Sequence, residues 1–467
     1  MVSLKSFSLR FWILNLMQMA ERLAFWIVLL QLPVYIAQKD TVGGLQFGQE
    51  SKGIIFFWWA LVQNTTPIFA GAYSDKYGSK KTLLFSFILI VFAYLLLGSQ
   101  REYLPFLMAT ILLGFGSGIF KPALHGALAS TMTDKNSPVG WGLYVMLVNL
   151  AVFFGPPLAI WLKGISWEAV FIGSAAIFSL NFITILFFKE NPIEAEIKQQ
   201  SSLIVLKRTL LTIVNPKILP IILLMSGFTM VYMQFYETLP NFIVDWVDSS
   251  TIVNYLPPFM LRQSGRGTQI AYEWFYNINS AMIILFVVLI SMLFSKKNKL
   301  LVLTIGIFSA TAGLLISGVS DLGIFTVIGF VIYTFGEMAA NPKFNEVISL
   351  SAPTREKGLY MSMINISWAF GLAGGSIMGG YLYKHFGEKA GFALRWLAEN
   401  GYVTDNISLQ NAFEMMCIKA NLSSLQAEKI LWNEYSPFIV WLPFVALGLI
   451  SSVGMIWLKK RSKNNYL

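Results

Sequence analysis

Residues 18–26 read Gln-Met-Ala-Glu-Arg-Leu-Ala-Phe-Trp and lie in the middle of an apolar run that extends from residue 9 to residue 37. A charged side chain at the centre of a bilayer costs roughly 2.5–3.5 kcal/mol, so neither Glu21 nor Arg22 is expected to face lipid. Helical spacing puts Gln18, Glu21 and Arg22 on one face. This stretch therefore predicts a membrane-spanning helix that directs a polar stripe into the interior of a helix bundle.

The composition excludes an ordinary soluble protein. Hydrophobic residues make up 56% of the chain and charged residues 12%, with a mean hydropathy of +0.63. Soluble domains carry about 25% charged residues. The single cysteine, Cys417, forms no internal disulfide. The first apolar run is too long for a signal peptide and lacks a small-residue cleavage pattern behind it, so we expect it to remain as a spanning helix.

Twelve apolar segments are long enough to span a membrane. They cover residues 9–37, 51–73, 80–98, 104–131, 138–163, 167–188, 217–247, 273–295, 299–318, 322–350, 357–383 and 437–459. An even number of spans puts both termini on one side, and most lysines and arginines lie on that side. We therefore predict an all-α integral protein of the plasma membrane or the bacterial inner membrane with cytoplasmic termini. The net charge of +10 follows from this topology, so no nucleic-acid partner is expected.

A polar linker divides the twelve spans into two sets of six. The prediction is an N-terminal bundle at residues 1–188, a cytoplasmic linker at 189–216 and a C-terminal bundle at 217–467. Residues 202–213 of the linker have the pattern of a short amphipathic helix at the membrane interface.

A second polar stretch, at about 384–436, interrupts the C-terminal bundle on the outer side. Residues 408–419 and 423–435 have helical patterns. Ser423 and Gln426 stand at the spacing of a capping box, which marks a helix start. We expect a small helical insertion there, and its sequence indicates no function.

The two halves repeat one another. Residues 142–149, Gly-Leu-Tyr-Val-Met-Leu-Val-Asn, recur as residues 358–365, Gly-Leu-Tyr-Met-Ser-Met-Ile-Asn, with Gly, Leu, Tyr and Asn in register. With equal numbers of helices in each half, this match predicts two six-helix bundles related by a pseudo-twofold axis along the membrane normal. That layout resembles the major facilitator superfamily of transporters.

The loop after the second span carries the same resemblance. Residues 71–81 are similar to that superfamily's signature G-x-x-x-D-(R/K)-x-G-x-(R/K)-(R/K). The matching residues are Gly71, Asp75, Lys76, Gly78, Lys80 and Lys81. The acid suits a neighbouring helix end, the glycines permit close approach and a tight turn, and the lysines anchor the cytoplasmic side. An ordinary basic turn is the alternative, and the motif gives no information on the substrate.

A narrower resemblance points to the proton-dependent oligopeptide transporter family. Residues 21–26 resemble its E-x-x-E-R-F-x-Y-Y-G motif, residues 116–122 its G-x-G-x-F-K-P motif and residues 144–149 its motif on the fifth helix. Glu337 lies in a segment similar to that of the tenth helix, and Asn279 matches an asparagine of the eighth.

This chain departs from the family at several positions. Gln18 replaces the first glutamate of the motif, Phe25 and Trp26 replace two tyrosines, and Trp368 occupies the place of an asparagine on the eleventh helix. One titratable group is therefore missing from the expected proton path, so coupling and substrate preference are expected to differ from those of a standard peptide symporter.

The resemblance implies that Glu21, Arg22 and Lys121 couple protons to substrate. Lys121 lies near the middle of its span, where an ammonium needs an anionic partner, and Glu21 is the expected one. In this scheme protonation of the glutamate frees the cations to hold a substrate carboxylate. A static ion pair that fixes helix packing is the alternative.

The expected substrate site uses residues from both halves. They are Arg22, Phe25, Trp26, Lys121, Tyr144, Asn149, Tyr232, Glu237, Asn279, Glu337 and Trp368. Glu337 suits a substrate amine or a structural hydrogen bond, and Glu237 suits an outer gate or a wet vestibule. His125 shares a face with Lys121 and is either a proton shuttle or a satisfied core residue.

Three functions remain open on the sequence. The first is a proton-coupled symporter that imports small peptides or peptide-like solutes by alternating access, and works as a monomer. The second is a proton-coupled antiporter that exports a drug-like or amphiphilic molecule, and the third is a non-transporting receptor. We find no metal-ligand pattern, nucleophile motif or phosphate loop, so no enzyme and no cofactor beyond the coupling proton is expected.

Overall fold

The computed structural model describes residues 7–39, 41–133, 136–190, 218–351 and 357–461. The predicted linker at 189–216, apart from its first two residues, and the amphipathic helix at 202–213 lie outside the described residues.

The N-terminal bundle follows the predicted spans closely. Its helices are α1 (Leu9–Ala37), α2 (Gln49–Thr65), α3 (Pro67–Tyr77), α4 (Ser79–Ser99), α5 (Tyr103–Ala129), α6 (Ser137–Ile165) and α7 (Trp167–Thr184). The second predicted span is divided between α2 and α3, because Pro67 has no N–H to continue the hydrogen-bond ladder. Gly78 makes the turn into α4 with a φ of 91°, which only glycine adopts readily, as the signature motif predicts.

The C-terminal bundle has the same plan with one large insertion. Its helices are α9 (Leu219–Glu237), α10 (Leu239–Trp246), α11 (Glu273–Leu293), α12 (Lys299–Gly318), α13 (Gly323–Ser351), α14 (Lys357–Phe386) and α18 (Leu442–Arg461). The short 3-10 helix η4 (Pro437–Trp441) leads into α18. The predicted span at 217–247 is divided after α9, and Pro240 lies in the first turn of the new helix.

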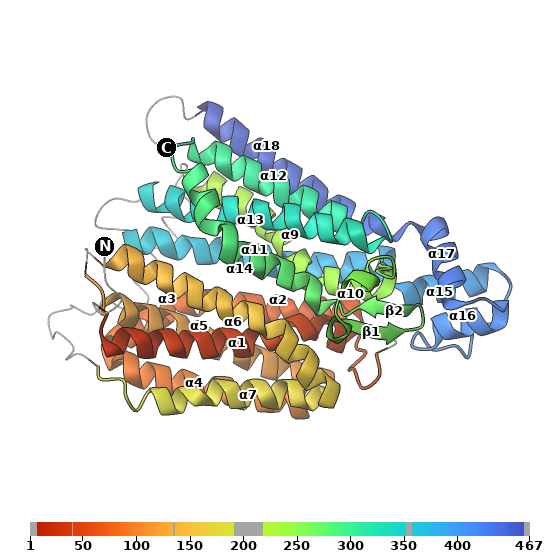
Figure 1. The fold of residues 1–467 in the computed structure, drawn as a ribbon, viewed down its shortest axis with the longest axis horizontal. Coiled ribbons are helices and arrows are strands. Elements are labelled where there is room, and N and C mark those ends of the chain that lie inside the picture. The colour runs from red at the N-terminus through yellow and green to blue at the C-terminus, as the bar shows by residue number, and fades with distance from the viewer. Residues whose placement is uncertain (1–6, 40, 134–135, 191–217, 352–356, 462–467) are drawn as a thin grey trace.

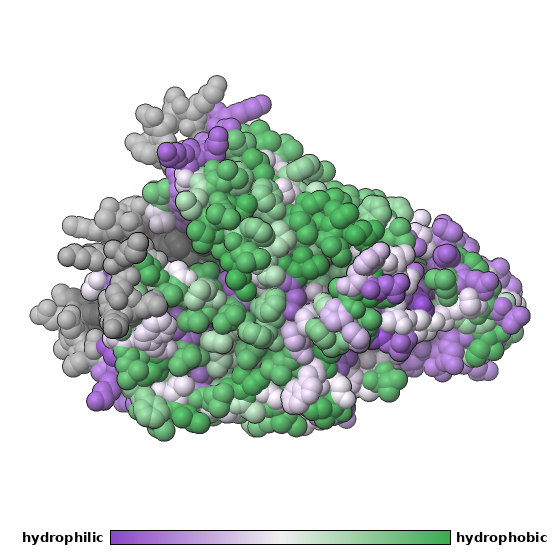
Figure 2. Space-filling model, viewed as in Figure 1, coloured by the Kyte–Doolittle hydropathy of each residue, from purple (hydrophilic) through white to green (hydrophobic). Residues whose placement is uncertain are grey.

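Ten helices of the described chain are long and apolar enough to cross a membrane. The two other predicted spans are covered by α2 with α3 and by α14. Figure 2 shows apolar residues over the outside of the long helices, where a lipid bilayer would contact them. The protein is therefore an integral membrane protein of many spans.

Three helices form a cap at one end of the molecule, opposite the two termini (Figure 1). They are α15 (Lys389–Glu399), α16 (Ala412–Ala420) and α17 (Ser424–Tyr435). The predicted capping box of Ser423 and Gln426 is present at the start of α17. The first of these helices was not predicted, and neither was the hairpin of β1 (Leu261–Ser264) and β2 (Gly267–Ile270) beside the cap. We call the two ends of the molecule the cap side and the termini side.

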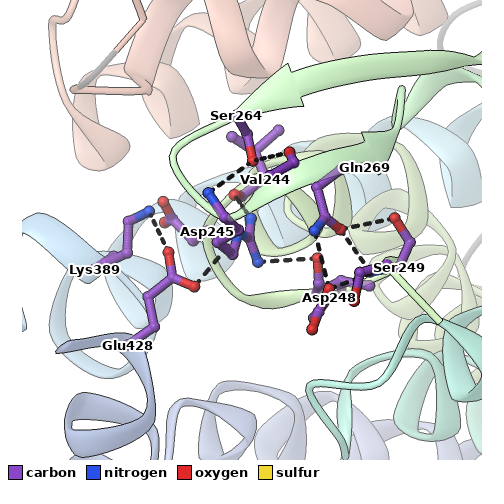
Figure 3. A network of polar contacts seen from close by, with 12 residues as sticks. Val244, Asp245, Asp248, Ser249, Ser264, Gln269, Lys389 and Glu428 are labelled. Carbon is purple, nitrogen blue, oxygen red and sulfur yellow. Dashed lines mark hydrogen bonds and ion pairs between the residues drawn. The ribbon is translucent and has the colours of Figure 1, made fainter. Parts of the chain in front are cut away.

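The cap is fastened to the C-terminal bundle through the end of α10 (Figure 3). Arg266 of the hairpin donates to the carbonyls of Val244 and Val247 at 2.5 and 2.9 Å and lies 3.4 Å from the carboxylate of Glu428 on α17. Lys389 at the start of α15 binds the same carboxylate at 3.2 Å. The cap and this bundle are thus held together by buried polar contacts.

Glycines bring α14 close to α9. A Cβ atom at Gly371 would lie 1.7 Å from the hydroxyl of Thr229, and one at Gly379 would lie 2.3 Å from the side-chain oxygen of Gln234. Glycine at these positions therefore permits the close approach of the two helices.

Candidate transport site

A cavity of about 340 Å³ lies between the two bundles. Its walls come from α1, α2 and α5 of the N-terminal bundle and from α9 and α14 of the C-terminal bundle. The lining residues are Arg22, Phe25, Trp26, Leu29, Trp59, Ala60, Gln63, Asn64, Lys121, Tyr232, Met233, Tyr236, Ile364, Asn365, Trp368 and Leu372. Six of the predicted site residues are among them, one or more from each of four helices.

The predicted proton-coupling residues adopt a different pairing from the expected one. Both nitrogens of the Arg22 guanidinium that face Glu21 donate to its carboxylate, and Gln18 donates to the same carboxylate at 2.9 Å. Glu21 is 2% exposed and does not line the cavity, whereas Arg22 does. The guanidinium also lies 4.6 Å from the centre of the Phe25 ring, a cation–π contact. The expectation that Glu21 pairs with Lys121 is therefore wrong for this structure, because the adjacent arginine occupies the carboxylate.

Lys121 extends from α5 into the cavity wall. Within the described residues, no carboxylate lies within salt-bridge distance of its ammonium group. An ammonium at membrane depth without a protein counterion is costly unless water or a ligand solvates it. The cavity thus presents one cation that is available to an anionic ligand.

The facing wall holds a carboxylate behind a tyrosine. The hydroxyl of Tyr232 donates to Glu337 at 3.1 Å, and the amide of Asn279 donates to the other oxygen of Glu337 at 2.8 Å. Only the tyrosine lines the cavity, since Glu337 is 8% exposed and its partner asparagine 4%. A ligand amine would reach the carboxylate only where the tyrosine hydroxyl now binds it.

The residues predicted from the fifth-helix motif lie away from the cavity wall. Tyr144 shares a hydrogen bond of 2.8 Å with the Nε2 atom of His125, and Asn149 donates to the carbonyl of Val145 at 2.9 Å. The hydrogen bonds of these three residues and the ring contacts of Tyr144 and His125 join residues of α5 and α6, as a packing role requires. The prediction that Tyr144 and Asn149 contact substrate is not supported by this geometry.

Helix α2 contributes lining residues that were not predicted from the sequence. Trp59, Gln63 and Asn64 line the cavity, and Trp59 packs against Phe25 with ring centres 5.5 Å apart. Trp59 and Gln63 are four residues apart and share a helical face, so the helical periodicity of residues 51–73 could have indicated them. No motif marked them.

Glu237 belongs to a contact between the bundles on the cap side of the cavity. It is fully buried, so the predicted wet vestibule is wrong. Lys52 of α2 donates to the backbone carbonyl of Glu237 at 3.0 Å and to the side chain of Asn241 at 2.9 Å. The same asparagine donates to Gln38, whose amide donates to Asp245 of α10 at 2.6 Å. We call these five residues the Lys52 cluster.

A second buried polar contact joins α1 and α6 to α11. Lys163 lies 3.4 Å from the carboxylate of Glu273, and Gln31 donates to the same oxygen at 2.9 Å. The hydroxyl of Tyr272 donates to the carbonyl of Leu30 at 2.9 Å. Together with the Lys52 cluster, these contacts close the cavity toward the cap.

Comparisons with known proteins agree with this architecture. The family model of the Major Facilitator Superfamily matches residues 14–376. The uncharacterized MFS-type transporter YttB of Bacillus subtilis is 23% identical over 322 residues, which cover 68% of this chain and 75% of that protein. The multidrug resistance protein MdtH of Yersinia enterocolitica is 22% identical over 335 residues, covering 69% and 75%.

A solved structure of a POT family transporter in complex with 5-aminolevulinic acid has the same fold. Its TM-score is 0.66 at 17% identity, and the match covers 97% of this chain and 96% of that one. The predicted major facilitator fold is confirmed, and the function is that of a transporter rather than an enzyme. With a family model that matches well over half of its length, the chain belongs to the Major Facilitator Superfamily.

Proposed function

We propose that this protein is a proton-coupled symporter that imports small peptides or peptide-like solutes by alternating access. One observation carries the proposal: a central cavity has a cationic wall of Arg22 and Lys121 opposite a wall where Tyr232 covers Glu337. A zwitterionic solute presents a carboxylate to the first wall and an amine to the second. The aromatic side chains between them suit variable side groups of such a solute.

Glu21 is the proposed proton acceptor. While it is ionised it holds the guanidinium of Arg22, and a proton on its carboxylate releases that guanidinium toward the cavity. The proton therefore makes the second cation available for the substrate carboxylate, and Lys121 supplies the first. In this proposal the termini are cytoplasmic, the protein works as a monomer and the proton is the only coupling ion.

Export of a drug-like amphiphile is the second candidate. Six aromatic residues line the cavity. Four of them carry no hydroxyl group and favour an apolar ligand, namely Phe25, Trp26, Trp59 and Trp368. The relative MdtH is a multidrug resistance protein by name. In that case the proton would leave the site as the amphiphile enters, and the cations would have no carboxylate to bind.

The test is uptake of a labelled dipeptide into proteoliposomes under an inward proton gradient. We expect Lys121→Ala to abolish both uptake and exchange of labelled for unlabelled dipeptide, because substrate binding itself is lost. We expect Glu21→Gln to abolish gradient-driven uptake and to retain exchange, because only the proton is lost. Lys189→Ala, at an exposed position after α7, serves as the matched control and should transport normally.

Absence of dipeptide uptake by the unaltered protein, with efflux of a cationic dye against its gradient, would establish the exporter instead. Dipeptide binding without uptake or efflux would establish the receptor.

A further inference from the structure

A second cavity, of about 280 Å³, lies between α11 and α13 on the termini side. Its lining residues are Ile290, Ser291, Phe294, Ser295, Met338, Ala339, Pro342, Lys343 and Glu346. We call this cavity the α11–α13 groove. It contains no residue of the N-terminal bundle, and its position is independent of the central cavity.

The groove opens away from the transport path. Pro342 follows Glu337 by five residues, which places it about 140° around the axis of α13 from the side chain that meets Tyr232. Helix α11 exposes the large apolar residues Leu285, Met292 and Leu293. Met292 and Leu293 stand between the groove residues Ser291 and Phe294 in the sequence, so the exposed apolar surface of α11, which is suited to contact with lipid, borders the groove.

Positive charge is in excess at the shallow end of the groove. The ammonium of Lys343 lies 2.6 Å from the carboxylate of Glu346, and that of Lys299 lies 3.8 Å from the same carboxylate. Two cations thus share one anion. Lys296 and Lys297 stand in the exposed turn between α11 and α12 and add two further charges.

Depth separates the apolar lining from the charged lining. Both helices run from the cap side to the termini side, so Ile290 and Met338 lie deeper in the bilayer than Ser295 and Glu346. A groove that is apolar at depth and cationic near the membrane surface matches the two parts of a phospholipid, its acyl chain and its phosphate. A soluble anion would make no favourable contact with the apolar lining of the groove.

We propose that the α11–α13 groove binds an acidic phospholipid of the leaflet on the termini side. The phosphate lies between Lys343 and Lys299, and an acyl chain follows Ile290 and Phe294 toward the middle of the bilayer. Basic pockets between spanning helices are suited to acidic head groups for this electrostatic reason. The site contributes a lipid ligand to the C-terminal bundle whatever solute the central cavity carries.

The experiment is native mass spectrometry of the full-length protein in detergent, titrated with phosphatidylglycerol. Removing one lysine near a membrane surface weakens binding of acidic lipid about fivefold. We therefore expect Lys343→Gln to raise the dissociation constant of phosphatidylglycerol by about that factor, and Lys343→Arg to restore it. Lys189→Gln, at an exposed lysine of the N-terminal bundle, should leave it unchanged.

A second variant separates a lipid site from an ion pair that only supports the fold. In a lipid site Glu346 competes with the phosphate for both lysines, so Glu346→Gln should tighten phosphatidylglycerol binding. Weaker binding in Glu346→Gln would overturn the proposal, and so would equal effects of Lys343→Gln and Lys189→Gln. Equal affinity for phosphatidylcholine with the same acyl chains, or displacement by millimolar inorganic phosphate, would also overturn it. Thermal unfolding of each variant in phosphatidylcholine should match that of the unaltered protein.

Discussion

The central cavity and the Lys52 cluster each contain a lysine at membrane depth, but the surroundings of the two ammonium groups differ. Lys121 extends into the cavity wall, and its neighbour Arg22 takes the nearby carboxylate. Lys52 is completely buried and donates to two acceptors of the opposite bundle at 3.0 and 2.9 Å. The first lysine has its charge open to a ligand, and the second has its charge satisfied only while the bundles touch.

The geometry thus assigns different roles to the two lysines: Lys121 is placed to bind a ligand, and Lys52 is placed to hold the two bundles together. Loss of Lys121 removes nothing that holds the bundles together. Loss of Lys52 leaves Glu237 and Asn241 buried without the donor that crosses from α2. The following predictions use one measured quantity, the distance between spin labels at Val42 of the N-terminal bundle and Val403 of the cap. This distance reports whether the two bundles touch on the cap side. Both side chains are exposed, and Cys417 is replaced beforehand.

The largest effect is expected for Lys52→Met. The variant leaves the carbonyl of Glu237 and the side-chain oxygen of Asn241 without this donor. Each buried acceptor that loses its hydrogen bond costs about 1–3 kcal/mol, which favours separation of the bundles on the cap side. We expect the distribution of distances between the labels, measured by double electron–electron resonance, to move to longer values. Lys121→Met should leave that distribution unchanged.

Lys384→Met is the matched control for this prediction. Lys384 also bridges the bundles, at 2.8 Å from Glu50, but both side chains are about half exposed. Exposed ion pairs contribute about 0–1 kcal/mol, so the variant should keep the cap side closed. A shift in Lys384→Met as large as that in Lys52→Met would show that burial is not the reason for the difference.

Periodicity along the sequence predicted the spans and six of the sixteen residues that line the cavity. Apolar runs located the helices, and the polar stripe of residues 18–26 located the cavity. Lys52 was missed because its partners lie on another bundle, about two hundred positions away in the chain. Such pairing depends on how the two bundles pack against each other. Residue spacing along a single helix gives no information on that packing.

The predicted pairing of Glu21 with Lys121 was wrong for a related reason. Arg22 and Lys121 lie at similar depth, and either could pair with the carboxylate of Glu21. The family motif does not determine which of the two cations forms the pair. The structure gives Glu21 to Arg22, the neighbour in sequence, and Gln18 adds a donor where the family has a second acid.

An intermediate effect is expected for Gly380→Ala at the crossing of α2 and α14. A Cβ atom at Gly380 would lie 2.5 Å from the backbone oxygen of Gln49 and 3.1 Å from the Cα of Gly53. Because backbone atoms cannot move aside alone, overpacking should cost about 1–3 kcal/mol of the closed state. The label distance should lengthen in a fraction of the molecules.

Gly142→Ala makes the same chemical change where a Cβ atom meets nothing within 4 Å. It should leave the label distance unaltered and raise the unfolding temperature slightly, because alanine favours the helix. If both glycine variants behave alike, the close crossing of α2 and α14 does not contribute to closure.

The smallest effect is expected from the titration of Glu388, which lies outside the spans at the start of the cap. Burial and the carboxylate of Asp245 raise the pKa of Glu388 to about 7. The cations of Lys39 and Lys52 lower this pKa and offset part of the rise. Within the described residues, one carboxylate oxygen of Glu388 and the side-chain oxygen of Gln49 are buried without donors. Both line one small cavity between the bundles, where a proton on Glu388 would provide the missing donor.

The sign of the pH dependence follows from linkage. Separation of the bundles hydrates Glu388 and returns its pKa toward the ordinary carboxyl value, so the closed state binds the proton more tightly. Closure is then strongest below pH about 4.5 and weakens as the pH rises to about 7, above which it is constant. We expect the long-distance fraction between the labels to increase several-fold over that interval and Glu388→Gln to remove the change. The exposed cap variant Glu434→Gln should preserve it, and a pH dependence that survives in Glu388→Gln would assign the proton to another member of the contact between the bundles.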